Sequence, residues 1–420
     1  MPVTHPTRHS RTFVQTADTR LLFLTRIIRM FAYGFLSVVL ALYLASLGLS
    51  GEKIGLLFSF TLLGDVVVSL VITLIADRVG RKRMLMLGSV LMAAAGIVFA
   101  FTNNYLLLLI AGTIGVIAPS DKDIGPFLSI EQAALSQLMA DRERTKSFAW
   151  YNLAGSFASA TGSLVCGSLV GLLQSREHLP LDPYRMVVIF YALCGLILLV
   201  MFRLLSPAVE VKTSIPAERT SAFPLRESRG IVMSLSSLFA IDAFAGGFIV
   251  QSMIAYWFHL KFGVEPATLG GIFFGANILA GFSALSAAQL AARFGLINTM
   301  VYTHIPSSIL LILVPLMPSL PLAIVMLLLR FSISQMDVPT RQSYTMAVVK
   351  PEERSAASGV TNVVRSVGAS ISPALCGRML ASQAFMSAPF FVAGVLKIMY
   401  DLILYRRFRH VRPPEEHHLA

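Results

Sequence analysis

Charged side chains interrupt the apolar stretches of this sequence, and their types and positions suit a pathway for protons or polar molecules. A charge deep in a membrane is costly, so it usually serves a pathway rather than the fold. Counted as helix, Glu131 and Arg341 each lie about 15 Å from the nearest loop. The candidate pathway residues are Arg29, Tyr33, Asp65, Asp121, Lys122, Asp123, Glu131, Asp242, Asp337, Arg341 and Arg365.

Several of these residues admit two roles. Asp65 is a lone carboxylate in an apolar stretch, so it is either a proton carrier or the partner of a nearby arginine. Arg29, with Tyr33 one turn later, can bind a cargo carboxylate or phosphate, because arginine binds such groups with two hydrogen bonds. Tyr33 alone can equally be a packing residue. Asp242 and Asp337 are weaker candidates for proton carriers.

The apolar stretch from 105 to 140 is too long for one crossing of a membrane. As a helix it would run about 54 Å, whereas the hydrocarbon core is about 30 Å thick. Residues 118–126, Ala-Pro-Ser-Asp-Lys-Asp-Ile-Gly-Pro, form a charged interruption where the helix must unwind or bulge. Discontinuous helices of this kind tend to mark the substrate site in repeat-built transporters. The alternative is a bulge that only redirects the second part of the helix.

The composition is that of a polytopic membrane protein. Hydrophobic residues make up 55% of the 420 residues, only 13% are charged, and the mean hydropathy is +0.73. A net charge of +12 raises the question of nucleic acid, but the basic residues stand in short loops between apolar spans. That distribution favours orientation in a lipid bilayer, and no nucleic-acid partner is expected.

Twelve apolar runs have the length of a membrane span, at roughly 21–46, 54–76, 84–102, 105–140, 147–174, 184–206, 230–255, 267–291, 298–317, 320–349, 356–382 and 387–405. If both termini are cytoplasmic, the cytoplasmic segments hold twenty-two Lys and Arg residues and the outer loops hold four. The positive-inside rule therefore predicts cytoplasmic termini. We expect a plasma (inner) membrane location.

The polar stretch between the sixth and seventh spans is the natural linker between two halves. The expected organisation is a cytoplasmic tail (1–20), a six-helix bundle (21–206), a cytoplasmic linker (207–229), a second six-helix bundle (230–405) and a cytoplasmic tail (406–420). The fold class is an all-α membrane protein with two pseudo-symmetric bundles.

The two halves echo each other in sequence. Gly55, Arg78 and Gly80 match Gly270, Arg293 and Gly295 at a shift of 215, and Gln132, Arg144 and Asn152 match Gln342, Arg354 and Asn362 at a shift of 210. The change of shift means that the first half carries five extra residues between Gly80 and Gln132. The charged interruption is the expected place, so the fourth span is predicted to be a helix with an insertion relative to the tenth.

The loop between the second and third spans, Asp77-Arg-Val-Gly-Arg-Lys-Arg83, resembles the signature of the major facilitator superfamily, Gly-x-x-x-Asp-Arg-x-Gly-Arg-Arg/Lys. The matching residues are Asp77, Arg78, Gly80, Arg81 and Lys82, whereas Thr73 replaces the leading glycine. With twelve spans, a central linker and the internal repeat, the resemblance covers essentially the whole chain. It implies alternating access, with this loop as a cytoplasmic gate. The expected partner of Asp77 is the start of the eleventh span, where Ser355 can cap a helix.

In that family, spans one, four, seven and ten line the central cavity, which implies that Glu131 and Arg341 face each other. The pair is then a structural bridge between two buried charges, a clamp for the substrate or a proton-linked switch. In the switch, protonation of Glu131 frees Arg341 to bind an anion.

Other chemistry finds little support. No pair of histidines has the spacing of a buried metal site, and no glycine-rich loop could hold ATP phosphates. We therefore expect neither a metal nor a cofactor, and no enzyme. The predicted function is proton-coupled efflux of a drug or metabolite by a monomeric secondary transporter. The alternative is an importer, symporter or uniporter of a small organic anion.

Overall fold

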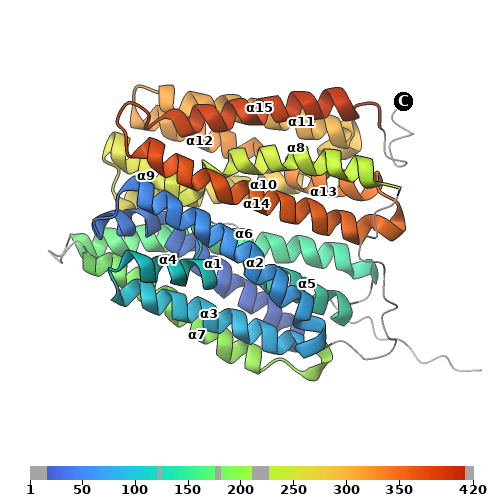
Figure 1. The fold of residues 1–420 in the computed structure, drawn as a ribbon, viewed down its shortest axis with the longest axis horizontal. Coiled ribbons are helices and arrows are strands. Elements are labelled where there is room, and N and C mark those ends of the chain that lie inside the picture. The colour runs from blue at the N-terminus through green and yellow to red at the C-terminus, as the bar shows by residue number, and fades with distance from the viewer. Residues whose placement is uncertain (1–16, 121–124, 140, 176–180, 211–226, 412–420) are drawn as a thin grey trace, which may run out of the picture.

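The computed structural model describes residues 17–120, 125–139, 141–175, 181–210 and 227–411, without the side chains of residues 141–146, 181, 182, 351 and 355. The long helices in these ranges run roughly along one axis (Figure 1). Helices suit a membrane because they satisfy their own backbone hydrogen bonds where no water is present. Ten of the described helical segments are long and apolar enough to cross one.

The first half of the chain forms the lower part of the molecule in Figure 1. Asn104 begins α4 by accepting hydrogen bonds from the backbone of Leu106 and Leu107. Gly80 stands between α2 and α3 with a φ of +114°, which side chains rarely adopt. The elements are α1 (Ala17–Ser46), α2 (Gly51–Val79), α3 (Arg81–Phe101), α4 (Tyr105–Ile114), α5 (Phe127–Leu138), α6 (Asp141–Gln174), α7 (Leu181–Arg203) and the short turn η1 (Pro207–Val209).

The second half lies above it, in yellow to red in Figure 1. Gly295 stands between α10 and α11, with a φ of +84°, as the repeat partner of Gly80. The elements are α8 (Arg229–Gly247), α9 (Gln251–Phe262), α10 (Pro266–Phe294), α11 (Leu296–Leu313), η2 (Val314–Leu316), α12 (Leu320–Ile333), α13 (Asp337–Ala347), η3 (Pro351–Glu353), α14 (Arg354–Leu380) and α15 (Ala388–Phe408).

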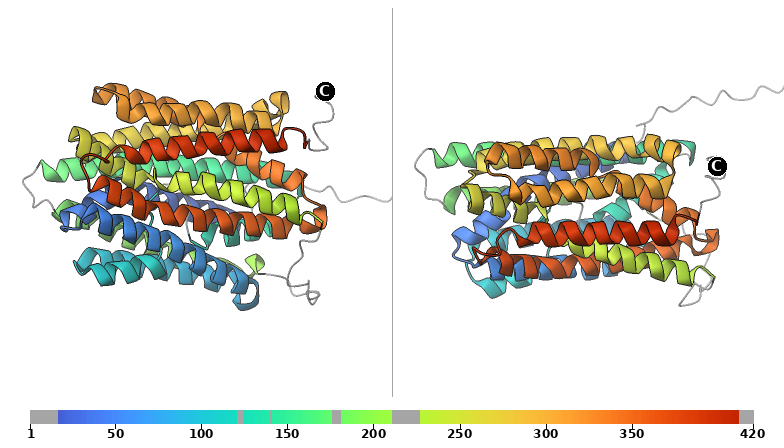
Figure 2. Two further views of the ribbon diagram at one scale, coloured as in Figure 1. Left: turned by 45° about the horizontal axis from the view of Figure 1, so that its top comes forward. Right: turned by 90° about the horizontal axis from the view of Figure 1, so that it is seen from above.

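Three crossings are built from two helices each: α4 with α5, α8 with α9, and α12 with α13. Counted in this way, the described helices make the twelve crossings that the sequence predicts. An even number of crossings brings Ala17 and Phe408 to the same end of the bundle, which we call the terminal end (Figure 2). The other end is called the opposite end.

The fourth span is interrupted, and so are the seventh and tenth spans. Residues 115–126 separate α4 from α5, whereas only residues 334–336 separate α12 from α13 in its repeat partner. Residues 248–250 also interrupt the seventh span. The prediction of an interruption is therefore confirmed for the described part of the fourth span. The tenth span, its repeat partner, is also broken, but by a shorter interruption.

Glycines let the two halves touch near the opposite end. A Cβ atom added to Gly55 of α2 would lie 2.8 Å from the Cα of Gly377 in α14. A Cβ atom added to Gly270 of α10 would lie 2.9 Å from the Cα of Gly167 in α6. Shifts of 215 and 210 convert the first contact into the second, so the sequence repeat corresponds to a structural repeat. Small residues allow such close backbone approach between helices in membranes.

Helix α1 occupies the interior of the first half. In its most apolar window 83% of the residues are buried, against 22% in that of α2. Helix α1 packs against α6 and α7 in its own half and against α9 in the other. Polar side chains on α1 are therefore shielded from lipid and can meet groups from several helices.

Alanine at neighbouring glycines of α10 should have opposite effects on stability. Gly270→Ala places a methyl group against Gly167 and should destabilise the protein by about 1–3 kcal/mol, because the site is already filled. Gly271→Ala meets nothing within 4 Å and should stabilise by up to about 1 kcal/mol through helix propensity. The midpoint of thermal unfolding in detergent measures both. Equal midpoints would contradict the close contact of α10 with α6.

Candidate functional site

Glu131 of α5 lies at the centre of a buried cluster in the first half. Arg29 of α1 donates two hydrogen bonds to its carboxylate, at 2.8 and 2.7 Å, and both side chains are fully buried. Thr25, one turn earlier on α1, donates a third at 3.0 Å, and the hydroxyl of Tyr151 on α6 donates a fourth. Four donors from two other helices thus converge on one buried carboxylate.

Aromatic rings enclose this cluster, which we call the Glu131 cluster. The guanidinium of Arg29 lies 4.7 Å from the ring centre of Phe127, and that of Arg26 lies 4.9 Å from the ring centre of Tyr151. Cation–π contacts of this kind stabilise a guanidinium that has lost water. The cluster joins α1, α5 and α6, so a change of charge on Glu131 alters contacts in three helices.

The structure does not bring Glu131 and Arg341 together, so the predicted pair is wrong. Glu131 is bound to Arg29 within the first half. Arg341 is bound to Asp337, at 2.7 Å and one turn away on α13, and to Asp242 on α8 at 3.2 Å. Each charge is compensated inside its own half.

Asp65 of α2 forms a hydrogen bond to the backbone near the end of the interruption in the fourth span. Its Oδ1 atom accepts a hydrogen bond of 2.6 Å from the backbone N–H of Gly125 and one of 3.2 Å from Ser69. In both of these hydrogen bonds the partner of Asp65 is a backbone amide or a hydroxyl group, not an arginine. The role of Asp65 as a proton carrier stays a prediction. Asp121, Lys122 and Asp123 lie outside the described residues.

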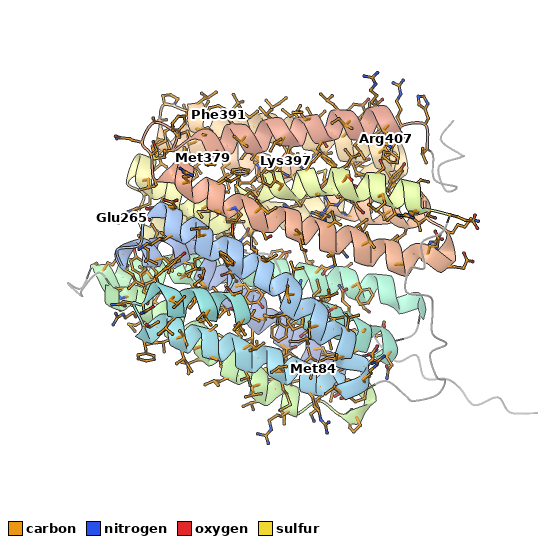
Figure 3. All side chains as sticks on the ribbon, in the orientation of Figure 1. Met84, Glu265, Met379, Phe391, Lys397 and Arg407 are labelled. Carbon is orange, nitrogen blue, oxygen red and sulfur yellow. The ribbon has the colours of Figure 1, made fainter. Side chains whose placement is uncertain are left out.

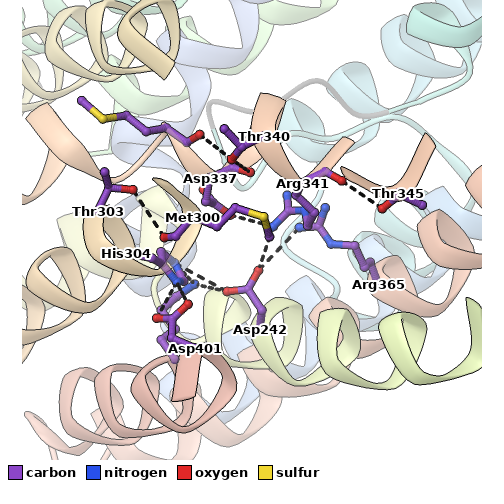
Figure 4. Close-up of polar contacts among 12 residues, drawn as sticks. Asp242, Met300, Thr303, His304, Asp337, Thr340, Arg341, Thr345, Arg365 and Asp401 are labelled. Carbon is purple, nitrogen blue, oxygen red and sulfur yellow. Dashed lines mark hydrogen bonds and ion pairs between the residues drawn. The ribbon is translucent and has the colours of Figure 1, made fainter. Parts of the chain in front are cut away.

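The second half contains a larger cluster around Asp242 of α8, drawn in Figure 4. Lys397 of α15 donates to its Oδ1 atom at 2.6 Å, and Arg341 donates to Oδ2 at 3.2 Å. Arg365 of α14 and His304 of α11 are the two more distant basic partners of Asp242, each at 3.8 Å from its carboxylate. One carboxylate thus connects four basic side chains from four helices.

His304 extends this cluster to a second acid. Its Nδ1 atom lies 3.0 Å from both oxygens of Asp401 on α15. We call Asp242, His304, Asp337, Arg341, Arg365, Lys397 and Asp401 together the Asp242 cluster. Lys397 lies between Phe391 and Arg407 on α15 (Figure 3), close to the middle of this helix, which places the cluster near the middle of the bundle.

Tyr33 is fully buried, and its ring stacks on that of Tyr191 with the ring centres 6.3 Å apart. This contact agrees with a packing role. Its part in binding a cargo stays a prediction.

Neutral polar groups connect the two halves. Gln251 at the start of α9 donates to Ser37 of α1 at 2.9 Å, and Ser252 donates to the Ser37 carbonyl at 2.7 Å. The backbone N–H of Ser252 donates to the carbonyl of Pro119 at 3.1 Å. The described part of the interruption in the fourth span therefore meets the start of α9, directly after the interruption in the seventh span.

The family model of the Major Facilitator Superfamily matches residues 22–373, which is most of the chain. The chain belongs to this superfamily. It is therefore a secondary transporter in a membrane that carries a small-molecule substrate, rather than an enzyme, as the sequence predicted.

Two relatives and one solved structure extend this result. The "uncharacterized membrane protein YJR124C" of Saccharomyces cerevisiae is 31% identical over 418 residues, covering 92% of this chain and 93% of the yeast protein. The quinolone resistance protein NorA of Staphylococcus aureus is 32% identical over 82 residues, only 20% of this chain and 21% of NorA. The inward-facing, occupied structure of a bacterial homologue of the human lysosomal transporter Spinster has a TM-score of 0.74 at 16% identity, covering 94% and 97% of the two chains.

The superfamily signature forms the junction of α2 and α3 at the terminal end, where only Gly80 lies outside a helix. Arg81 donates to Asp77 at 2.9 Å, and the predicted contact of Asp77 with the start of the eleventh span stays a prediction. The predicted cap, the side chain of Ser355, lies outside the described residues. Glu210, just after η1, accepts hydrogen bonds from the backbone N–H groups of Arg81 and Lys82 at 2.7 and 3.2 Å. A carboxylate at a helix N-terminus is favoured by the helix dipole.

Sequence analysis missed several members of the clusters in this superfamily protein. Lys397, which is paired with Asp242, was not among the predicted pathway residues. His304 was considered only as a metal ligand. The sequence spacing could have identified two of them. Lys397 and Asp401 are four residues apart and therefore share one face of the last span, as Asp337 and Arg341 do in the tenth. The residues missed as members are Thr25, Tyr151, His304, Lys397 and Asp401.

A double-mutant cycle tests the pairing of Arg29 with Glu131. Arg29→Met leaves a buried carboxylate without its cation and should cost about 3–5 kcal/mol of unfolding free energy. Adding Glu131→Gln removes the stranded charge, so the double variant should be more stable than Arg29→Met alone. Unfolding in detergent measures all three variants. Additive losses would contradict the pairing, because independent sites contribute additively.

Proposed function

We propose that this transporter couples the export of a drug or metabolite to the entry of protons, with Glu131 as the proton site. The observation that carries the proposal is the convergence of Arg29, Thr25 and Tyr151 on a fully buried carboxylate. A proton on Glu131 removes the negative charge that holds Arg29. The guanidinium is then left without its counter-ion, which is costly in the bundle interior.

The position of the Glu131 cluster supports a link between this proton and the movement of the halves. Helices α1 and α6 both contribute donors to Glu131, and both pack against the second half, α1 against α9 and α6 against α10. Loss of the charge therefore changes helices that form the contact between the halves. Alternating access requires two packed arrangements, and in this proposal a proton on Glu131 selects between them.

We infer that the structure is closed toward the outside. The counts of Lys and Arg favour cytoplasmic termini, so the opposite end, with Gly55 against Gly377, faces outward. The proposed moving units are the bundles 21–206 and 230–405, in a monomer in the plasma (inner) membrane. The signature loop is proposed to close the cytoplasmic side when the carrier faces outward.

The partial similarity to the quinolone resistance protein NorA supports efflux as the direction. The neutral groups between the halves, among them Gln251 and Ser37, support a cargo that is held by hydrogen bonds rather than by a charge.

Import of a small organic anion is the second candidate, and Arg365 favours it. Arg29 and Arg341 are each held within 2.8 Å of a carboxylate, whereas Arg365 lies 3.8 Å from Asp242 and is 28% exposed. Its Nε atom has no hydrogen-bond partner among the described residues. It therefore has donors to offer an anion.

Proton movement in proteoliposomes tests the proposal. External cationic or neutral compounds should alkalinise the inside of acid-loaded vesicles that contain the wild-type protein. Glu131→Gln should abolish this signal, because the amide cannot exchange a proton. Asp65→Asn tests the other predicted proton carrier in the same assay.

Glu265→Gln is the matched control, because Glu265 is exposed just before α10 at the opposite end. It should transport protons as the wild type does. Uptake of anions without a proton signal, abolished by Arg365→Gln and kept in Glu131→Gln, would replace the exchanger with the anion importer.

A further inference from the structure

His304 is placed to bind and release a proton in the second half. Because its Nδ1 atom faces both oxygens of Asp401, the hydrogen-bond pattern assigns a proton to Nδ1. Its Nε2 atom lies 3.5 Å from Nζ of Lys397 and 3.8 Å from Asp242. In the neutral imidazole, Nε2 can accept from Lys397. In the protonated imidazole, Nε2 must donate, and the acceptor within reach is Asp242.

The charged and titratable groups near His304 lie on the helices packed against α11, which are α10, α12, α13 and α15, and on α8 and α14. Helix α15 contributes Lys397, Tyr400 and Asp401; α8 contributes Asp242; and α13 contributes Asp337 and Arg341. The charged residue of α12 is Arg330, which lies over the ring of Phe331, and that of α10 is Arg293, which lies over the ring of Phe294 at the terminal end. Arg365 of α14 completes the set through Asp242.

The fixed charges of the Asp242 cluster balance only while His304 is neutral. Three carboxylates, of Asp242, Asp337 and Asp401, face three cations, of Arg341, Arg365 and Lys397. A proton on His304 adds a positive charge that the cluster does not compensate. An uncompensated charge in the bundle interior is costly, so one cation must loosen.

Arg365 is the cation that leaves most easily. The side chains of Arg341 and Lys397 are 4% and 10% exposed, against 28% for Arg365. Arg341 keeps Asp337 at 2.7 Å, whereas Arg365 has only the 3.8 Å contact with Asp242 among its described ion pairs. Arg365 also stands on α14, the helix that meets α2 of the first half through Gly377 and Gly55.

We propose that His304 is a second proton-binding site, and that its protonation displaces Arg365 from Asp242. The protonated imidazole then bridges Asp401 and Asp242, and the guanidinium turns toward the exposed side of α14. This site is separate from Glu131 and does not rest on the proposed direction or cargo of transport.

Nitrogen NMR of the full-length protein in lipid nanodiscs, labelled with ¹⁵N-histidine, tests the proposal without any transport. The ring signals of His304 are assigned by their loss in His304→Gln and by their shift in Asp401→Asn. Spectra are recorded from about pH 5 to 8, the range in which a histidine side chain ordinarily changes charge. Because linkage is reciprocal, Arg365→Gln should raise the ratio of charged to neutral imidazole by about fivefold or more at one pH in this range, the lower end of couplings between sites.

Two control variants isolate the charge of Arg365. Arg365→Lys keeps a cation near Asp242 and should stay close to the wild-type ratio. Arg378→Gln removes an exposed arginine from the same helix and should leave the ratio unchanged. A wild-type His304 that does not titrate in this range, or an equal ratio in Arg365→Gln and the wild type, would overturn the proposal. Glu131→Gln should leave the titration in place, which separates this site from the proton site proposed in the first half.

Discussion

A charge inside a bilayer has no water to solvate it, so every ionised side chain there needs a partner from the protein. This requirement organises the interior of the chain. Glu131 collects donors from α1 and α6, and Asp242 collects basic side chains from α11, α13, α14 and α15. Helices that are distant in sequence are thereby held at the same depth.

The buried charges are compensated by partners within the same half of the molecule, which affects how the two halves can move. In the described residues, the Glu131 cluster uses only the first half and the Asp242 cluster only the second. The contacts that connect the halves involve glycine backbones and neutral side chains such as Gln251 and Ser37. The halves can therefore part without leaving buried charges unpaired. A bridge from Glu131 to Arg341 would have lacked this property.

Sequence analysis identified much of the fold and most of the charged residues, because apolar length and charge at depth are local properties. The repeat shift of Gly55 and Gly270 also predicted equivalent positions, and the structure shows them in equivalent contacts. The partners of each charge were harder to predict. Two residues at one depth can face each other or face away, and the rotation of each helix about its axis decides which. Pairing by repeat symmetry therefore failed for Glu131, whose partner Arg29 lies on α1.

The sequence by itself determined that this chain spans a membrane twelve times, that its halves are repeats and that it carries costly charges near mid-depth. Those features follow from hydropathy, spacing and the price of an ion in hydrocarbon. Only the tertiary structure decided which charges form clusters, that the tenth span is broken as the fourth is, and that His304 joins Asp242 to Asp401. The physical reason is that such contacts depend on how helices from distant parts of the chain pack, which no local pattern records.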